Sequence, residues 1–324
     1  MNQPHSAKID IFTHFAPEKY RKAFYSKAYS NLYNDWDIPG LYDINVRLGF
    51  VDKYQGLKQV LSLPGPPLET MAAPNDAVEL AKIANEELAE LVAKYPTRFA
   101  ASVACLPMND IDAAIKEAER AIEKLNMRGV MIFTPCNEKP LDSPEFMPLY
   151  EMLAKYDLPL WIHPTTSRDI PDYKGESHSK YLIYRTIGWP YQTSLAMARL
   201  VVSGVMEKYP SLKIIAHHCG GIIPHFAHRQ TYGELDPSLK RRPVEYLRMF
   251  YGDTCLMGNT TALMCSYAFF GGKHMVFGTD LPQNTTVAKE RKIANVIESV
   301  ERMDIPQTDK QQIFEGNARA LLHL

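Results

Sequence analysis

Long apolar runs, a net charge and cysteine pairs are features that this sequence lacks. No stretch of about 18 consecutive apolar residues occurs, so the sequence predicts no membrane-spanning helix. The 36 basic and 37 acidic residues leave a net charge of −1, which gives no support for binding to nucleic acid or another polyanion. Residues 1–6 also lack the basic and then apolar pattern of a secretory signal peptide.

The five cysteines are odd in number and widely spaced, and none belongs to a C-x-x-C pair. This usage favours reduced thiols and therefore a cytoplasmic location. Neither an internal repeat nor a low-complexity segment is present. The 324 residues, of which 46% are hydrophobic, can bury one large core, and we expect a single domain over residues 1–324.

What the sequence does contain is a regular alternation of short apolar segments and longer amphipathic ones. The short segments predict strands at residues 9–15, 59–63, 99–105, 129–133, 158–163, 212–217, 249–253 and 274–278. The amphipathic segments predict helices at residues 43–54, 75–92, 110–125, 144–156, 192–209, 259–270, 287–302 and 308–322. Several strands are apolar throughout, as strands covered on both faces should be. The order predicts an α/β fold, a (β/α)₈ TIM barrel.

Residues 16–42 interrupt this alternation between the first predicted strand and the first predicted helix. The segment is rich in aromatic residues. We expect it to be an insertion over the mouth of the barrel, either as a packed cap or as part of the wall of a substrate site.

Polar residues that can bind a metal stand at the ends of four predicted strands. They are His14, His163, the adjacent pair His217 and His218, and Asp280. The functional groups of an α/β barrel lie at the C-terminal ends of its strands. Imidazoles and a carboxylate gathered there predict a site for one divalent metal ion.

Short motifs along nearly the whole chain accompany these strand ends. They are, in order, IDIFTHF at 9–15, VR at 46–47, YPTRF at 95–99, LPM at 106–108, WIHP at 161–164, GVMEKYP at 204–210, HCGGIIP at 218–224, FGTDLP at 277–282 and GNA at 316–318. Their order and spacing resemble the decarboxylase branch of the amidohydrolase superfamily, which includes aminocarboxymuconate-semialdehyde, γ-resorcylate and 5-carboxyvanillate decarboxylases. The resemblance covers residues 8–322 and implies a barrel of the amidohydrolase type.

The resemblance implies roles for the residues at the strand ends. His14, His163, His218 and Asp280 would bind the metal, and His218 and Asp280 would also act as acid or base groups. His218 is chosen over His217 because its spacing from the following proline matches that of the family's catalytic histidine. Adjacent side chains on a strand point to opposite faces, so we expect His217 to be structural.

Three further residues are candidates for contact with a substrate. Arg47 and Arg229 match arginines that bind the substrate carboxylate in the family's type enzyme, where the match of Arg229 reaches across a dimer interface. A guanidinium suits bidentate binding of a carboxylate, although a lone arginine often forms a surface ion pair instead. Trp189 is either a wall for a flat substrate or a core residue. The resemblance therefore implies a small carboxylate substrate and a homodimer or larger homo-oligomer.

The first strand departs from the family pattern at one position. The pattern D-x-H-x-H, or its variant with glutamate for the first histidine, places a metal ligand where this chain has Phe12, which cannot ligate. Three protein ligands and a water still make a catalytic zinc site, so we expect zinc. Manganese and magnesium are alternatives, because a missing imidazole favours metals that prefer oxygen. Asp10, on the same face of the strand, either replaces the missing ligand or lies too deep in the barrel.

Together these features predict a metal-dependent non-oxidative decarboxylase, a carbon–carbon lyase that acts on a small planar aromatic or muconate-like acid. A metal-dependent hydrolase or hydratase of a ring-cleavage product is the alternative, since a metal-bound water can attack a carbon–carbon or ester bond. A non-catalytic protein that binds a small acid at a decayed site is the third hypothesis. Release of CO₂ separates the first from the second, and the absence of both metal and turnover would favour the third.

Overall fold

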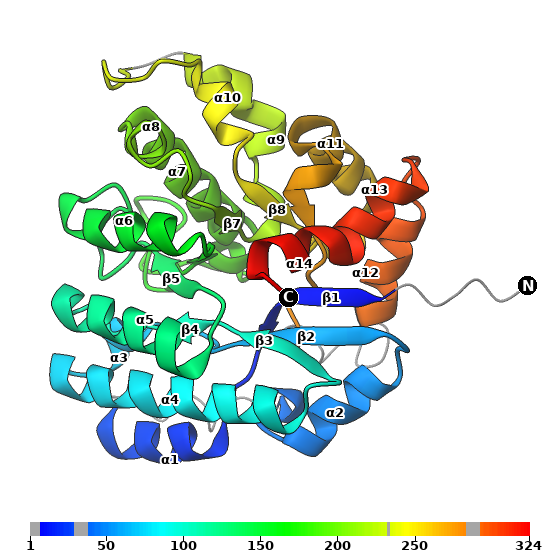
Figure 1. Ribbon diagram of the computed structural model, residues 1–324. Coiled ribbons are helices and arrows are strands. Elements are labelled where there is room, and N and C mark those ends of the chain that lie inside the picture. The colour runs from blue at the N-terminus through cyan, green and yellow to red at the C-terminus, as the bar shows by residue number, and fades with distance from the viewer. Residues whose placement is uncertain (1–6, 29–37, 232–233, 283–291) are drawn as a thin grey trace, which may run out of the picture.

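A computed structural model describes residues 7–28, 38–231, 234–282 and 292–324 (Figure 1). Parallel strands lie at the centre and helices surround them. The strands are β1 (Lys8–His14), β2 (Leu57–Ser62), β3 (Phe99–Ser102), β4 (Ala104–Cys105), β5 (Val130–Thr134), β6 (Leu160–Pro164), β7 (Ile214–Ala216), β8 (Tyr251–Asp253) and β9 (Met275–Val276). Each lies within or close to a segment whose apolar pattern predicts a strand.

The helices follow the strands in the predicted alternation. They are α1 (Glu18–Lys27), α2 (Ile44–Asp52), α3 (Leu68–Met71), α4 (Pro74–Lys94), α5 (Ile111–Leu125), α6 (Met147–Tyr156), α7 (Trp189–Val202), α8 (Val205–Lys208), α9 (Ile223–Phe226), α10 (Pro243–Leu247), α11 (Thr260–Phe270), α12 (Lys292–Glu301), α13 (Gln307–Gln311) and α14 (Asn317–Leu322). None of the helices in the described part of the chain is long and apolar enough to cross a membrane.

Backbone hydrogen bonds carry the strand pairing around the barrel. The strands pair in parallel in the orders β1-β2-β3 and β4-β5-β6-β7-β8-β9. Between β3 and β4, Val103 donates to the carbonyl of Leu61 and Ala104 to that of Gly129, so one stretch of chain passes from β2 to β5. Between β1 and β9, Ile11 of β1 donates to the carbonyl of Phe277, which directly follows β9. The predicted barrel fold is therefore confirmed, and the C-terminal ends of its strands share one end.

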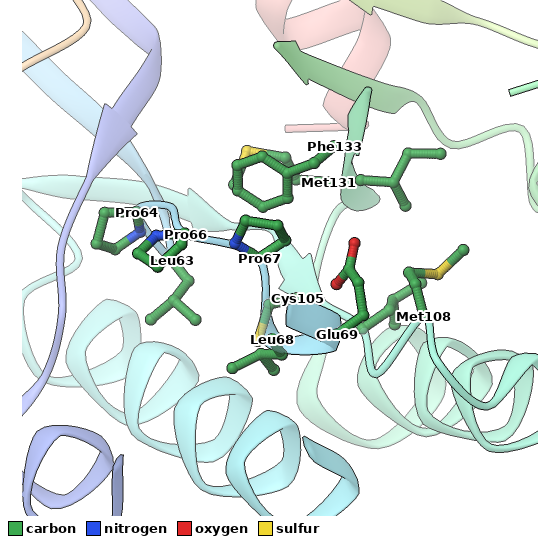
Figure 2. A pocket seen from close by; sticks show the side chains of 12 residues that line it. Leu63, Pro64, Pro66, Pro67, Leu68, Glu69, Cys105, Met108, Met131 and Phe133 are labelled. Atoms are coloured by element: carbon green, nitrogen blue, oxygen red, sulfur yellow. The ribbon is translucent and has the colours of Figure 1, made fainter. Parts of the chain in front are cut away.

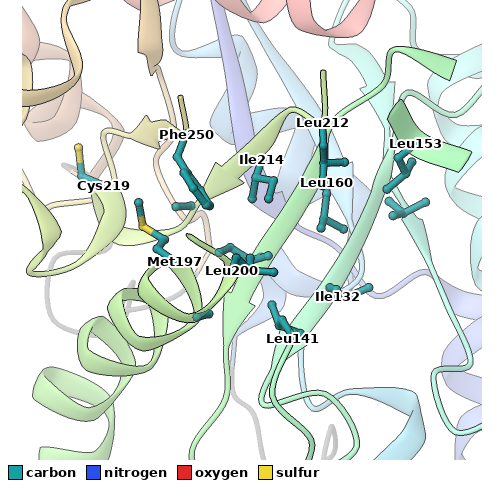
Figure 3. Close-up of a cluster of buried hydrophobic side chains, with 14 of the residues drawn as sticks. Ile132, Leu141, Leu153, Leu160, Met197, Leu200, Leu212, Ile214, Cys219 and Phe250 are labelled. Atoms are coloured by element: carbon teal, nitrogen blue, oxygen red, sulfur yellow. The ribbon is translucent and has the colours of Figure 1, made fainter. Parts of the chain in front are cut away.

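Two apolar layers hold this arrangement. Inside the barrel, side chains such as Ile11, Met131 and Ile215 form a buried cluster. The indole of Trp161 donates a hydrogen bond to the carbonyl of Ile11 at 3.1 Å. Between strands and helices lies a larger cluster, part of which Figure 3 shows: strand residues such as Ile214 face helix residues such as Leu200 of α7.

The aromatic-rich insertion lies partly outside the described residues, which omit 29–37. Its described helix, α1, packs against α4 in the outer layer, where Tyr20 and Phe24 are fully buried. Glu87 of α4 accepts hydrogen bonds from the backbone of Lys19 and Tyr20. This part of the insertion therefore packs against a helix, and the predicted cover over the barrel mouth stays a prediction.

Candidate active site

Three histidines and an aspartate converge at the C-terminal ends of the strands. His14 ends β1, His163 lies in β6, His217 directly follows β7, and Asp280 follows β9. One ring nitrogen from each of the three histidines lies within 4.8 Å of the others. Asp280 Oδ1 is 3.4 Å from Nε2 of His14 and 3.7 Å from Nε2 of His217. All four side chains are buried, so the fold brings together groups that are far apart in the sequence.

Each imidazole is oriented by a partner on its Nδ1 atom. The partner is Ser62 Oγ for His14 at 3.1 Å, the carbonyl of Pro164 for His163 at 2.7 Å, and Asp253 Oδ2 for His217 at 2.6 Å. This leaves the Nε2 atoms directed toward the cluster. Within the described residues, Nε2 of His14 and of His217 have no hydrogen-bond partner, which is costly for buried polar atoms. Three imidazoles with one carboxylate, each imidazole held from behind, fit a divalent metal ion.

Asp253 is a further candidate for the site, one that the sequence interpretation missed. It ends β8 and is fully buried. Its Oδ1 accepts hydrogen bonds from the backbone of Cys219 and Cys255, both at 2.9 Å, while Oδ2 faces His217. Burial lowers the pKa of His217, but Asp253 and Asp280 outweigh burial and raise the pKa to about 9. The available signal was its position, because the carboxylate stands at a strand end as Asp280 does.

Asp280 has a cationic neighbour, Lys292, that the sequence interpretation also missed. The ammonium group of Lys292 donates to the carbonyl of Asp280 at 2.7 Å and lies 3.5 Å from its Oδ2. Burial by itself raises the pKa of Asp280, but Lys292 and the imidazoles of His14 and His217 outweigh it and hold the pKa well below its usual value. The carboxylate is therefore ionised and able to ligate a cation.

The histidine pair is arranged differently from the sequence prediction, which assigned the site to His218 and a structural role to His217. His217 has extended backbone angles and continues β7 into the cluster. His218 has a φ of 53° and starts a left-handed turn. The rule that adjacent side chains face opposite ways applies only within a strand. Because His218 has left the strand, its ring lies beside that of His217, with 3.8 Å between the centroids.

His218 lies at the edge of the cluster and is half-buried. Its Nδ1 has no hydrogen-bond partner within the described residues. Burial, and then the charge of His217, lower the pKa of His218 to about 3, so the ring is neutral. The turn continues with positive φ at Cys219 (54°), Gly220 (74°) and Gly221 (62°). It packs against the start of α7, since a Cβ atom on Gly221 would lie 2.1 Å from the carbonyl oxygen of Pro190.

Phe12 fills the position of the missing ligand. Its ring stacks on His217 with 3.8 Å between centroids and an interplanar angle of 10°, and lies 5.6 Å from the ring of His14. Asp10 does not join the cluster: its carboxylate accepts hydrogen bonds from the backbone and hydroxyl of Thr279 and from Gln59. The described donor set is therefore three imidazoles and Asp280, with an aromatic ring packed against it.

The two arginines are not gathered at the cluster. Arg47 is fully buried and donates hydrogen bonds to the carbonyls of Gly40 and His14 and to the side chain of Gln59. This differs from the predicted role of Arg47 in binding a substrate carboxylate, because its guanidinium supports the end of β1 instead. Arg229 is exposed, on the short helical turn Ala227–Thr231.

Trp189, at the start of α7, does contact the site. Its ring lies 5.8 Å from that of His163, edge to face, and 6.4 Å from that of His218, stacked. The indole Nε1 is buried without a hydrogen-bond partner among the described residues. The guanidinium of Arg185 lies over the same ring at 4.7 Å. Trp189 thus forms one side of the site, with a polar atom available to a ligand.

The fold is a parallel α/β barrel, and histidines and an aspartate suited to metal binding lie at the C-terminal ends of its strands. This combination is typical of metal-dependent barrel enzymes. The family model described as amidohydrolase matches residues 9–324. The chain belongs to the amidohydrolase family, as its motifs predicted.

Individual relatives agree with this assignment. The chain is 30% identical to γ-resorcylate decarboxylase of Polaromonas sp., over 98% of this chain and 99% of the relative. It is 29% identical to 2-amino-3-carboxymuconate-6-semialdehyde decarboxylase of Dictyostelium discoideum, over 87% of this chain and 77% of the relative. A crystal structure of a dihydroxybenzoic acid decarboxylase from Polaromonas sp., with bound manganese and the inhibitor 2-nitroresorcinol, is 28% identical, with a TM-score of 0.78 and coverage of 98% of this chain and 97% of the other.

Proposed function

We propose that this protein is a metal-dependent non-oxidative decarboxylase of a small planar aromatic acid that carries a carboxylate. The observation that carries the proposal is the cluster of His14, His163, His217 and Asp280, in which one ring nitrogen of each histidine lies within 4.8 Å of the others and the carboxylate of Asp280 faces two of the rings. The relatives support the reaction type, since they are named as decarboxylases of aromatic or muconate-like acids.

The cluster is the part of the chain that would hold the cation. His14, His163, His217 and Asp280 would be its protein ligands, with Asp253 orienting one of the imidazoles. When bound, a divalent cation supplies electrostatic stabilisation to oxygen atoms of the substrate. The manganese of the Polaromonas structure favours manganese for this chain, and zinc also suits a set of three imidazoles and one carboxylate.

Decarboxylation also needs a proton at the carbon that the carboxylate leaves. We assign this proton transfer to Asp280, which lies in the cluster, and keep His218 as a second candidate because its Nδ1 is unpaired at the edge of the site. Because Asp280 is ionised in the free site, it would first take a proton from a hydroxyl group of the substrate or from water. The carbon–carbon bond then breaks, CO₂ departs, and the ring carbon takes that proton from Asp280. Trp189 would lie along one side of the flat ring and exclude water from it.

We also propose that the chain forms a homodimer or a larger homo-oligomer. Large apolar side chains are exposed along residues 170–195 and on α9, beside the site and next to the turn that carries Arg229. The most exposed are Tyr181 at 90%, Tyr173 at 77% and Ile187 at 64%. Exposed apolar patches of this kind mark protein interfaces. In such an assembly, a second copy would bring its Arg229 toward the substrate. Light scattering coupled to size-exclusion chromatography measures the mass of the particle and so the number of chains in it.

The experiment that tests the function combines metal content with CO₂ release. Protein purified without added metal should carry about one divalent cation per chain, or take one up from manganese, and should release CO₂ from 2,6-dihydroxybenzoate or a related hydroxybenzoate. Asp280→Ala should lose both properties, whereas Asp304→Ala, a change at an exposed carboxylate, should keep both. A wild type that binds metal but converts none of these acids would overturn the decarboxylase proposal.

A further inference from the structure

A small pocket beside the histidine cluster contains a carboxyl group that the proposed mechanism does not use. The pocket lies between strand β5 and the segments that follow β2 and β4 (Figure 2). Its walls are mostly apolar and include Pro66, Pro67, Met131 and Phe133. The pocket has a cavity volume of about 10 Å³, which is room for one water molecule or one small polar group. The carboxyl group belongs to Glu69 of α3.

Glu69 is buried with few partners. The residue is only 8% exposed. It accepts hydrogen bonds from its own backbone N–H and that of Asn137, and the thiol of Cys136 lies 3.8 Å from Oε1. Among the described residues no lysine or arginine contributes to its charge balance, and burial raises its pKa to about 7. A carboxylate has about four sites that accept hydrogen bonds, so these three donors leave capacity for one more.

The pocket adjoins the cluster through one side chain. Phe133 of β5 lines the pocket, and its ring lies 5.1 Å from the ring of His163. The two residues are paired in register on neighbouring strands. Phe133 therefore contacts a ring of the cluster and also lines the pocket that holds Glu69.

A buried carboxyl group among prolines, methionines and a phenylalanine is unfavourable unless a ligand or a structural role compensates. We propose that Glu69 is a specificity-determining residue that accepts a hydrogen bond from a hydroxyl or amino substituent on the ring of the aromatic acid. The small volume limits the substituent to one heavy atom, and the carboxyl group disfavours an anionic one. This inference rests on the proposed function. The competing role is structural, because Asn137 belongs to the turn that the paired residues Cys136 and Lys139 close.

The test compares ring hydroxyl groups by calorimetry on the full chain loaded with manganese. The probes are salicylate and the 2,3-, 2,4-, 2,5- and 2,6-dihydroxybenzoates, which add one hydroxyl at each ring position. In wild type at about pH 8.5, where the carboxyl group of Glu69 is ionised, at least one isomer should bind about tenfold tighter than salicylate, the factor expected for a hydrogen bond to a charged group. Glu69→Leu should remove that preference and leave the affinity for salicylate within about threefold. Glu69→Gln, which keeps an acceptor oxygen, should restore part of the preference.

The control variant is Cys136→Ala, which removes a donor to Glu69 but leaves the carboxyl group in place. It should keep the preference of wild type. A preference that survives in Glu69→Leu would overturn the inference, and so would a wild type that binds every isomer no better than salicylate while still releasing CO₂. Equal losses for all probes in Glu69→Leu would assign the structural role instead. Failure of wild type to bind any probe would remove the proposed function itself, and this inference with it.

Discussion

The hydrogen bond between Asp253 and His217 makes a sharp prediction about metal binding. Asp253 Oδ2 accepts from Nδ1 of His217 at 2.6 Å, and Oδ1 accepts from the backbone of Cys219 and Cys255. In Asp253→Asn the amide oxygen keeps the two backbone hydrogen bonds, and the NH₂ group then faces His217. Nδ1 of His217 must become an acceptor, so its Nε2 carries the proton and cannot bind a metal.

The expected size of the effect follows from the position of Asp253 behind a ligand. Loss of such a partner typically costs 10- to 100-fold in metal affinity. This corresponds to about 1.4–2.8 kcal/mol of binding free energy. Because the asparagine has the same shape and keeps two of three hydrogen bonds, the loss should appear in metal binding more than in folding. Decarboxylation at limiting manganese should fall by the same factor and recover partly at high manganese.

Calorimetric titration of metal-free protein with manganese measures this affinity directly. Asp10→Asn is the matched control, since Asp10 is an equally buried carboxylate in the same barrel whose hydrogen bonds go to Thr279 and Gln59. Thermal unfolding of both metal-free variants checks that folding is preserved. If Asp253→Asn binds manganese as tightly as wild type, His217 is not oriented as a ligand and the reasoning is refuted.

Three further predictions concern Arg47, Glu69 and Phe12. Arg47→Met should lower the free energy of unfolding by about 3 kcal/mol or more, because it leaves buried carbonyls unpaired, whereas Arg229→Ala on the surface should change it by less than about 0.5 kcal/mol in urea titrations. The pKa of Glu69 is raised to about 7, so the wild type loses free energy of unfolding as the carboxyl group ionises between pH 4.5 and 7. Glu69→Gln cannot ionise, so its free energy of unfolding relative to wild type should rise by up to about 3 kcal/mol between pH 4.5 and 8.5. A difference that does not change with pH would contradict the assigned pKa. Phe12→His places a nitrogen ligand among the three imidazoles, so its manganese affinity should rise about tenfold, and an unchanged affinity would show that position 12 does not reach the cation.

The fold was predictable because its signal is local and repeated. Apolar segments such as residues 129–133 and 158–163 can only be buried strands when helical segments separate them, and β5 and β6 occupy these positions. His14, His163 and Asp280 were also accessible to sequence reasoning, since each stands at or just beyond the C-terminal end of a predicted strand, and these ends share one end of a barrel.

The remaining features depend on backbone angles and burial, which residue types do not specify. His217 rather than His218 joins the cluster because His218 has a left-handed φ, which is uncommon for a residue other than glycine. Arg47 belongs to a residue type that is rarely fully buried, yet its guanidinium is enclosed behind β1. Asp253 and Glu69 act through contacts with segments distant in sequence, so their roles appear only once the barrel has formed.

The close packing of Gly221 against Pro190 links two sides of the site that come from different elements. The turn that begins at His218 and the helix start that carries Trp189 rest on each other where no side chain fits. Any larger residue at position 221 would push the indole and the imidazole apart together. The spacing between Trp189 and His218 therefore depends on this backbone contact, and a substitution of Trp189 that alters the size of the accepted ring should leave Gly221 unchanged.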